Sequence, residues 1–576
     1  MKQTFKKRGQ KFSKKWERFS TQAKESSREH LQENLISRLP NARQVRLLIL
    51  EWGLLVIVVI SLALTQLFWY NQSYTAQAYV DGGTYIEATV GSISTMNPLF
   101  ATTGSEKVLS KLMFSTLSTV DYSGHVGLGL ADSIIPDETG KIWTVTLKPD
   151  LHWSDGEPIT LDDVLFTVSL MKSTEINTSY SSNFSGVSVE LSGESIIFTL
   201  PSPYADFAST LNIPILPEHI LGEVQPSKVL EHNFSTNPVT SGAFTFNATQ
   251  SVDNSGDKIV YLVANQNYYK GMPMLNNFAI RTYTTSTGIA DALLTGEVTA
   301  TADLSPLDSE TLTSALVYEK QTTIASGIYA FLNTASSVLS NQGVRQAVRQ
   351  GINMNELRSV LDGEEPLDYP ILKSELNLDA YPEIPGYDLS AAQTALRDAG
   401  ISGQTIRLAT ISTGYYPELA NNLEEQLEKL GFSVELSIYN PGQDFLMNVI
   451  RQRNYDILIY EIELGANPDL FPYYHSSQAT ASGLNLSNYR NALVDDSILA
   501  ARSTMNETLR TAKYETFLRY WVNDVPAIGI YQASLTYYFN KNARTFSEDD
   551  RLVYATDRFS DVEYWAVNKA TKNRTP

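Results

Sequence analysis

One apolar run constrains this chain most: LLILEWGLLVIVVISLALTQLFWY at residues 47–70, with no charged residue from Trp52 through Val80. At about 1.5 Å per residue, a helix from Trp52 to Tyr70 is roughly 28 Å long, close to the hydrocarbon thickness of a bilayer. Trp52, Trp69 and Tyr70 lie at its ends, where aromatic rings favour the membrane interface. We therefore expect one transmembrane helix at residues 47–70, with the rest of the chain divided between the two sides of a membrane.

Charge is divided unevenly between the two flanks of this run. Residues 1–46 hold 13 Lys or Arg and 4 Asp or Glu, a formal charge of +9. The whole chain carries −19, so the other 530 residues carry about −28. The positively charged flank of a transmembrane helix usually remains in the cytoplasm. We therefore expect a basic cytoplasmic tail at residues 1–46, attracted to anionic lipid, and an acidic body outside the cell membrane. Such a body repels phosphate backbones, so no nucleic-acid partner is expected.

A cleaved signal peptide is the alternative interpretation of the apolar run. The sequence AQA at residues 76–78 fits the small-residue pattern of a cleavage site. A retained anchor is favoured because the run exceeds the roughly 7 to 15 residues of a signal core and a long segment precedes it. The chain has no cysteine, which excludes disulfides, thiolate ligands and a lipidated cysteine, so the helix would be the tether.

The body begins after a polar segment, residues 71–82, which we interpret as a linker. Strand-like runs follow. In KIWTVTLK, residues 141–148, Trp143, Val145 and Leu147 alternate with polar residues, which predicts a strand with one buried face.

The stretch LHWSDGEPITLDDVLFTVSLM, residues 151–171, raises the question of a catalytic or metal site, because it concentrates acids, His152 and a tryptophan. SDGEP has the composition of a tight turn, and Thr160 with Asp163 forms a capping-box pattern before apolar residues at helical spacing. His152 has no second histidine at a ligand spacing. The stretch is therefore predicted to be a turn and a capped helix, with no metal.

Residues 405–461 alternate three strand-like segments, TIRLATI, FSVELSI and YDILIYE, with two helical ones. The first helix is expected over residues 417–430, ended by Gly431, and the second includes residues 445–451. This alternation predicts parallel strands, and ligands of such sheets bind beyond the carboxyl ends of the strands. The segment that follows the third strand, residues 461–478, is therefore the expected binding loop. Its candidate ligand-binding residues are Glu461, Glu463, Asn467, Asp469, Tyr473, Tyr474 and His475.

Three of these candidates have more than one interpretation. His475 could donate to a ligand carboxylate or cap the loop, and we favour the cap. The aromatic residues, including Tyr473 and Tyr474, could cover a solute or belong to the core.

Several motifs in a fixed order resemble those of the family 5 extracellular solute-binding proteins, the oligopeptide, dipeptide and nickel binding components of ABC importers. The motifs are STMNPLF at residues 94–100, the long segment 117–171, NPVTSGAFTF at 237–246, NQNYYKGMPMLNNFAI at 265–280, YDLSAAQTALRDAG at 387–400 and LEEQLEKLGFSVEL at 423–436.

The resemblance implies an α/β, two-lobed, type II periplasmic-binding-protein-like fold after the transmembrane helix, with the solute enclosed between the lobes. Lobe 1 would comprise residues 83–330 and 526–576, and lobe 2 residues 331–525. The resemblance also places Thr95, Met96 and Asn97 of lobe 1 opposite the binding loop.

The chain also departs from this family. Peptide-binding members carry an acid in the loop that pairs with the ligand's amino group, whereas a gapless comparison puts Ala466 near that position, between Glu463 and Asp469. The glycine-rich turn before an aromatic residue is altered to TSGAF. The resemblance thus implies the fold, while the solute stays open.

No HExxH, GxSxG, Walker A or GxGxxG pattern occurs, so we predict neither an enzyme nor a bound cofactor. The predicted function is that of a membrane-anchored extracytoplasmic protein that captures a peptide-like solute and delivers it to ABC permease and ATPase subunits. A sensor or surface scaffold of the same fold is the alternative.

Overall fold

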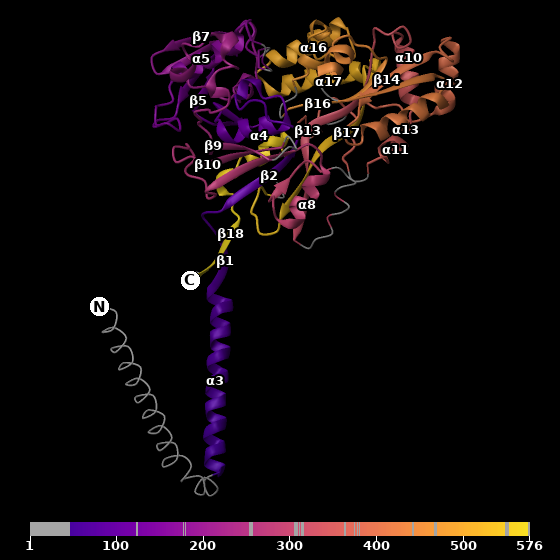
Figure 1. Ribbon diagram of the computed structural model, residues 1–576. Helices are drawn as coiled ribbons and strands as arrows, with labels where there is room; N and C mark the ends of the chain where they lie inside the picture. Colours follow the sequence, from indigo (N-terminus) through magenta and orange to yellow (C-terminus); the bar gives the residue numbers. More distant parts are fainter. Residues whose placement is uncertain are drawn as a thin grey trace, which may run out of the picture. The chain divides into compact units, whose positions relative to one another are not determined.

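The computed structural model describes residues 46–573, apart from the short segments 122–124, 177, 179, 182, 253–256, 305–308, 310–311, 313–315, 362–363, 374, 377, 379–380, 441–442, 466–468 and 548–551. The chain divides into two units. One combines residues up to Ala78 with those from Lys569 onward, and the other is Tyr79–Asn568. Each is described separately (Figure 1).

The described part of the first unit contains the long helix α3 (Arg46–Tyr74). Its segment Leu50–Tyr70 is long and apolar enough to cross a membrane, and none of it is buried. The next residues form β1 (Thr75–Val80), which pairs with the last strand of the chain, β18 (Asn568–Asn573). Gln77 Nε2 donates to Thr571 Oγ1 at 3.0 Å across this pair. Where we expected a linker, the structure thus has the end of a helix and a strand.

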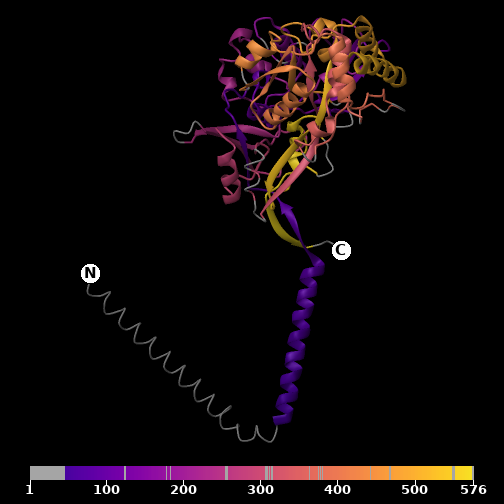
Figure 2. The same ribbon diagram turned by 90° about the vertical axis from the view of Figure 1, so that its right-hand side faces the viewer.

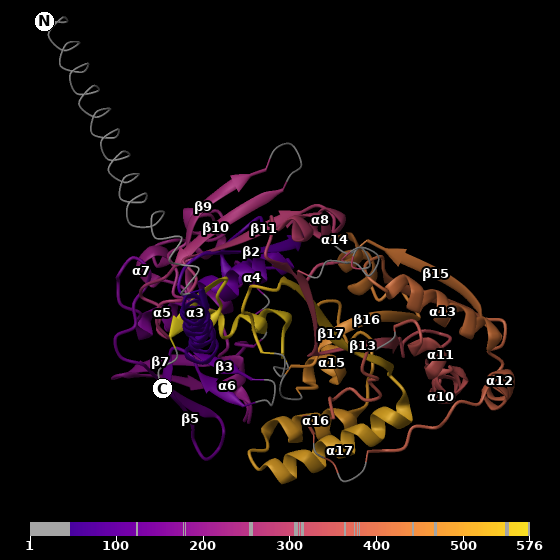
Figure 3. The ribbon, with the colours of Figure 1, turned by 90° about the horizontal axis from the view of Figure 1, so that it is seen from below.

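The second unit is built on one mixed ten-stranded sheet. Its strands, in spatial order, are β15 (Ser433–Tyr439), β14 (Thr405–Ile411), β16 (Ile457–Glu463), β13 (Val317–Leu332), β17 (Ala527–Asn540), β12 (Ala300–Thr301), β2 (Thr84–Val90), β11 (Asn277–Tyr283), β10 (Lys258–Ala264) and β9 (Phe244–Ser251). Figure 3 shows β9 and β15 at opposite ends of this sheet. Figure 2 shows β9 and β10, in magenta, reaching out sideways as a hairpin.

The predicted parallel segment is confirmed at the β15 end. Strand β14 pairs in parallel with both β15 and β16. Helix α13 (Tyr416–Lys429) buries Leu419, Leu423 and Leu427, and Gly431 after it has a φ of 100°, which suits glycine. The second predicted helix is shorter and irregular: α14 (Gln443–Phe445) leads directly into a π-helical turn, η6 (Leu446–Ile450).

Helices cover the β15 end of the sheet (Figure 3). They are α10 (Gln342–Gly351), α11 (Met354–Arg358), α12 (Leu389–Asp398), α15 (Phe471–Tyr474), η7 (Ser476–Gln478), α16 (Ala492–Ser503) and α17 (Glu507–Asp524). Two apolar clusters built around Leu458 and Ile459 lie here.

The β9 end carries a second, antiparallel sheet in the order β5-β6-β8-β7. The elements of this end are η2 (Pro98–Phe100), α4 (Gly104–Met113), β3 (Ser118–Val120), β4 (Val126–Leu128), β5 (Ala131–Pro136), β6 (Ile142–Leu147), α5 (Leu161–Lys172), β7 (Ser188–Ser192), β8 (Ser195–Thr199), α6 (Phe207–Thr210), α7 (Glu218–Leu221), η3 (Pro226–Lys228), η4 (Asn233–Ser235), α8 (Thr287–Thr295), η8 (Ala555–Phe559) and η9 (Val562–Tyr564). The predicted strand in KIWTVTLK is confirmed as β6, which buries Trp143 and Val145.

The stretch rich in acids and containing His152 is the predicted turn and capped helix. Gly156 has a φ of 98° in the turn. Asp163 Oδ2 accepts from Thr160 N at 2.8 Å, and its Oδ1 accepts from Glu218 N at 2.7 Å. His152 is exposed, and its Nδ1 lies 3.1 Å from Asp150 O. The carboxylate of Asp163 therefore caps the start of α5 and joins it to the start of α7.

Strands β13 and β17 join the two ends of the sheet. They pair antiparallel from Val317↔Asn540 to Phe331↔Ala527. Near one end of this ladder β17 pairs with β12, and near the other β13 pairs with β16. The register shifts between Thr323 and Gly327, so the ladder is interrupted between the two halves.

A buried ion pair ties the C-terminal segment to the β9 half. Arg558 Nη2 lies 2.6 Å from Glu87 Oε1, and the two side chains are 4% and 0% exposed. Tyr537 OH donates to Glu87 Oε2 at 2.5 Å. Strands β2 and β17 and the turn η8 are therefore connected through one carboxylate.

A second carboxylate fixes the loop before α4. Glu106 is 1% exposed and accepts from Ser94 N at 3.0 Å, Thr102 N at 2.9 Å and Thr103 N at 3.1 Å. Burial alone would raise the pKa of Glu106, but hydrogen bonds from Ser94, Thr102 and Thr103 outweigh it and lower the pKa from 4.5 to about 2. The folded state therefore stabilises the ionised form of Glu106.

Replacing Arg558 by Met should lower the free energy of unfolding by about 3–5 kcal/mol, because Glu87 is left buried without its cation. Urea unfolding followed by circular dichroism measures this loss. The matched control is Arg519→Met, whose partner Glu515 lies one turn away on α17 and whose own side chain is 67% exposed. That change should cost at most about 0.5 kcal/mol. Equal losses in the two variants would contradict the prediction.

Replacing Glu106 by Gln should cost about 1–2 kcal/mol at pH 7, because the amide keeps an acceptor oxygen but loses the charge-assisted hydrogen bonds of the buried carboxylate. The pKa of Glu106 is lowered in the fold, so its contribution is complete above about pH 4.5 and disappears as the pH falls toward about 2. Urea unfolding at pH 7 and pH 3 should show the difference from the parent shrinking. Glu138→Gln, at an exposed position, is the control. A loss for Glu106→Gln that is the same at both pH values would contradict this prediction.

Candidate functional site

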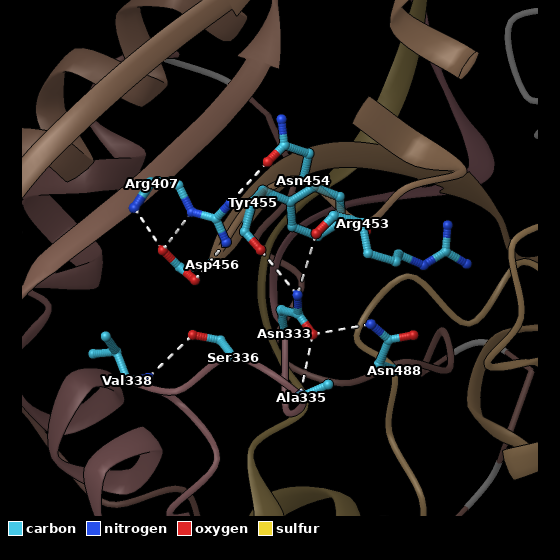
Figure 4. A network of polar contacts seen from close by, with 10 residues as sticks. All are labelled: Asn333, Ala335, Ser336, Val338, Arg407, Arg453, Asn454, Tyr455, Asp456 and Asn488. Atoms are coloured by element: carbon cyan, nitrogen blue, oxygen red, sulfur yellow. Dashed lines mark hydrogen bonds and ion pairs between the residues drawn. The ribbon is translucent and has the colours of Figure 1, made fainter. Parts of the chain in front are cut away.

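The amino end of β16 is fixed by a network of polar contacts (Figure 4). Asn333, directly after β13, donates from Nδ2 to Tyr455 O at 2.9 Å, and its Oδ1 accepts from Asn488 Nδ2 at 3.0 Å. Asp456 accepts from Arg407 N at 2.8 Å and forms an ion pair with the guanidinium at 3.1 Å. With this end fixed, the register of β16 determines which side chains emerge at its carboxyl end.

Two acids, Glu461 and Glu463, alternate on β16 and therefore face the same side of the sheet. The chain is then held against β13, because Leu464 N and Gly465 N both donate to Ala325 O, at 2.8 Å and 3.2 Å. The next candidate, Asn467, lies outside the described residues, as does Ala466.

Glu463 is loosely paired. Its Oε1 lies 3.7 Å from Lys107 Nζ on α4, and the two side chains are 56% and 53% exposed, so the contact is weak. Burial first, and the charge of Glu463 second, raise the pKa of Tyr180 to about 12. The same two causes raise the pKa values of Tyr473 and Tyr554. Glu463 thus lies near three tyrosines and an exposed lysine, and its carboxylate remains accessible.

Glu461 is more enclosed than Glu463. Its Oε2 accepts from Tyr416 OH at 3.3 Å, and Tyr416 stacks on Tyr415 with ring centroids 5.3 Å apart. Burial raises the pKa of Glu461, although hydrogen bonds from Ser326 and Tyr416 oppose the shift. Its partners are hydroxyl groups, which can be exchanged for a stronger donor.

Asp469 already has a protein cation. Its Oδ2 lies 3.2 Å from Arg502 Nη2 and accepts from Tyr204 OH at 3.2 Å, while its Oδ1 accepts from Phe471 N at 3.2 Å. Both oxygens are engaged, in contrast with the carboxylate of Glu463.

The last three candidates of the loop differ in their surroundings. Tyr473 OH donates to Glu463 O at 2.6 Å, which places its ring beside that acid. Tyr474 is fully buried and packs on Phe517 of α17, with ring centroids 5.5 Å apart. His475 Nδ1 accepts from Ser477 N at 3.1 Å, as the capping interpretation requires.

The lobe 1 candidates Thr95, Met96 and Asn97 are buried, and their hydrogen bonds stay within the β9 half of the chain. Met96 N donates to Ser235 O at 2.7 Å, and Asn97 Oδ1 accepts from Leu99 N at 3.2 Å. Their connection to the loop is indirect. Thr95 N donates to Glu106 at 3.3 Å, and the next residue on α4, Lys107, is the one that reaches Glu463.

Sequence reasoning missed the residues that meet the loop from the β9 half and from α16. Lys107, Tyr204 and Arg502 contact the loop directly, and Tyr180 and Tyr554 are close enough for the charge of Glu463 to raise their pKa values. No motif marks them, because they come from segments far apart in the chain. Within the described ranges, no group of three His, Cys, Asp or Glu side chains could hold a metal ion.

Comparison with known proteins shows the family of the chain. The family model for bacterial extracellular solute-binding proteins, family 5 Middle, matches residues 125–483. The oligopeptide-binding protein AppA of Bacillus subtilis is 26% identical over 481 residues, covering 78% of this chain and 86% of its own. Its structure in complex with a nonapeptide has a TM-score of 0.72 at 24% identity, covering 85% of this chain and 100% of that one.

NikZ from Campylobacter jejuni, solved in complex with Ni(L-His), is also similar in fold. It has a TM-score of 0.72 at 22% identity and covers 84% of this chain and 99% of its own. The mixed α/β fold therefore matches that of periplasmic binding proteins. The chain belongs to the bacterial extracellular solute-binding proteins of family 5.

Proposed function

We propose that this protein is a membrane-anchored extracytoplasmic solute receptor that encloses a peptide-like solute between two lobes and delivers it to an ABC permease. The observation that carries the proposal is the meeting of the β16 loop with side chains from the other half of the sheet, at the carboxyl end of a parallel segment. The relative AppA, an oligopeptide-binding protein solved with a nonapeptide, supports a peptide as the solute.

The two lobes in this proposal are residues 83–330 with 526–576, and residues 331–525. The separate apolar clusters support the division. One is built from residues such as Trp153 and Phe278, and two others contain Leu458 and Ile459. These bounds assign nearly all of strands β13 and β17 to lobe 1, but Ile328 and Ile530 of these strands pack in the same cluster as Ile459 of lobe 2, so the two strands would be the crossing segments between the lobes.

Within this site, Glu463 is the acid that best suits a solute's ammonium group. Its carboxylate is exposed and its contact with Lys107 is long, so a ligand cation can replace or join the lysine. The rings of Tyr180, Tyr473 and Tyr554 would contact apolar side chains of the solute. Glu461, held by Tyr416 OH at 3.3 Å, would be a second contact for a cationic group.

The anchor belongs to the same proposal. Segment Leu50–Tyr70 is long and apolar enough to cross a membrane, and residues 1–46 carry a formal charge of +9. We infer that the tail is cytoplasmic and that the second unit, Tyr79–Asn568, is outside the membrane.

Replacing Glu463 by Gln should weaken binding of a peptide with a free amino terminus about tenfold. The peptide's ammonium group would lose its partner in a partly exposed charge pair. Peptides that co-purify with the protein are first identified by mass spectrometry and then titrated by calorimetry. Glu425→Gln, at an exposed position of α13, is the matched control and should bind like the parent.

An N-acetylated form of the same peptide separates amine pairing from other effects. It should bind the parent about tenfold more weakly and should bind the Glu463→Gln variant no worse than the free peptide does. If Glu463→Gln binds the free peptide within about threefold of the parent, amine pairing at Glu463 is wrong.

Protease added to intact cells should remove the second unit and spare residues 1–46 in a membrane-bound fragment, because the positive flank keeps the tail inside. Immunoblotting with a tag at the amino terminus measures this. As a control, an Ala76→Phe, Ala78→Phe variant, which blocks signal peptidase, should have the same size as the parent. A mature amino terminus directly after Ala78 in the parent would show that the anchor is removed.

A further inference from the structure

One short segment of the β9 half contacts α16 directly. Residues 203–206 follow β8 and precede α6. Ala205 N donates to Arg502 O at 2.9 Å, close to the end of α16. Tyr204 OH donates to Asp469 Oδ2 at 3.2 Å. Two hydrogen bonds therefore join the proposed lobe 1 to the proposed lobe 2 at this point.

The side chain of Arg502 is at the centre of this contact. Its guanidinium carbon lies 4.2 Å from the ring centroid of Tyr204 and 4.8 Å from that of Phe471. Its Nη2 is 3.2 Å from Asp469 Oδ2. Arg502 is thus in cation–π contact with one ring from each lobe and is paired with the acid that Tyr204 also reaches.

The same contacts argue against a solute at Asp469. An ammonium group would have to displace Arg502 and Tyr204 from Oδ2, and Oδ1 already accepts from Phe471 N at 3.2 Å. Glu463, only six residues away, has one exposed lysine at 3.7 Å. Of the two candidate acids on either side of Ala466, Glu463 is available to a ligand and Asp469 is already paired within the protein.

We propose that Tyr204, Asp469 and Arg502 form an interlobe clasp that stabilises the closed arrangement of the lobes without solute and slows solute release. This inference rests on the proposed two-lobed function. The clasp favours closure because its hydrogen bond and ring contact exist only when the lobes meet, so a solute needs to supply only the remaining free energy. The ion pair itself lies within lobe 2, and only the hydroxyl and ring of Tyr204 reach it from lobe 1, which keeps the clasp modest in strength.

The test is the distance between the lobes in solute-free full-length protein in lipid nanodiscs. The chain has no cysteine, so spin labels at Glu190→Cys on β7 and Glu428→Cys on α13, both exposed positions, report one distance by double electron–electron resonance. Removal of co-purified solute is checked by mass spectrometry. In the parent we expect a population at the short, closed distance.

Tyr204→Phe removes the hydroxyl and keeps the ring. It should shift the closed-to-open ratio about three- to tenfold toward open, and Asp469→Asn should do the same. The double variant should add little to either single change, since both disrupt one interaction. Tyr261→Phe, which removes a hydroxyl that donates to Gln250 within lobe 1, is the matched control and should leave the ratio unchanged.

Two results would overturn the clasp. One is a parent that shows only the open distance without solute. The other is a distance distribution that Tyr204→Phe and Asp469→Asn leave unchanged; if Asp469→Asn then weakens binding of the co-purified peptide, Asp469 is a solute contact. Should Asp469→Asn fail to fold, Arg502→Lys replaces it, keeping the charge and losing the planar stacking, and it should open the lobes to an intermediate extent.

None of these distance measurements requires that the solute be a peptide. The distances are measured without solute, so failure of the peptide proposal and failure of the clasp give different results. If no peptide binds but the closed population falls in Tyr204→Phe, the clasp stands.

Discussion

The antiparallel pairing of β13 with β17 is the interaction on which the rest of this fold depends. Their ladder runs from Val317↔Asn540 to Phe331↔Ala527 and carries β12 and β2 on one side and β16 and β14 on the other. Its register shifts beside Gly327, where an added Cβ would lie 2.4 Å from Leu367 Cδ2. Both proposed lobes are joined through this one ladder, so a hinge between them would be expected at its irregular stretch.

Local sequence patterns predicted the helices and strands well, but they did not predict which distant strands pair. The β14–α13–β15–β16 order followed from alternating periods and from Gly431, and the turn and capping box at Thr160 followed from short-range chemistry. No local signal predicts that β16 also pairs with β13, which makes one mixed ten-stranded sheet of what the sequence indicates as a small parallel one. The π-helical turn at Leu446–Ile450 likewise has no sequence signature that we recognised.

The sequence predicted which loop forms the candidate site. It predicted much less well which side chains of that loop are accessible and which are already paired. The rule for parallel strands led to the loop after β16, and Glu463 is indeed an accessible acid there. The sequence could not show that Asp469 is already paired, because Arg502 and Tyr204 come from other segments and meet it only in the folded chain. The placement of Thr95–Asn97 opposite the loop stays a prediction: their hydrogen bonds lie within the β9 half, and Lys107 is the residue of that half that reaches Glu463.

The contrast between Glu463 and Asp469 suggests how affinity and closure can be divided between two acids of one loop. A receptor whose lobes closed only through its solute would need every solute to supply the whole closing free energy, which favours a narrow range of ligands. With part of that free energy supplied by Tyr204, Asp469 and Arg502, solutes of different length and side chain can each supply the rest through Glu463 and the tyrosines. The small number of contacts that cross between the lobes matters here, since only Tyr204 and the Ala205 amide meet the Asp469–Arg502 pair of lobe 2, and opening for entry has few interactions to break. A clasp of intermediate strength is therefore the arrangement that suits a receptor for variable solutes.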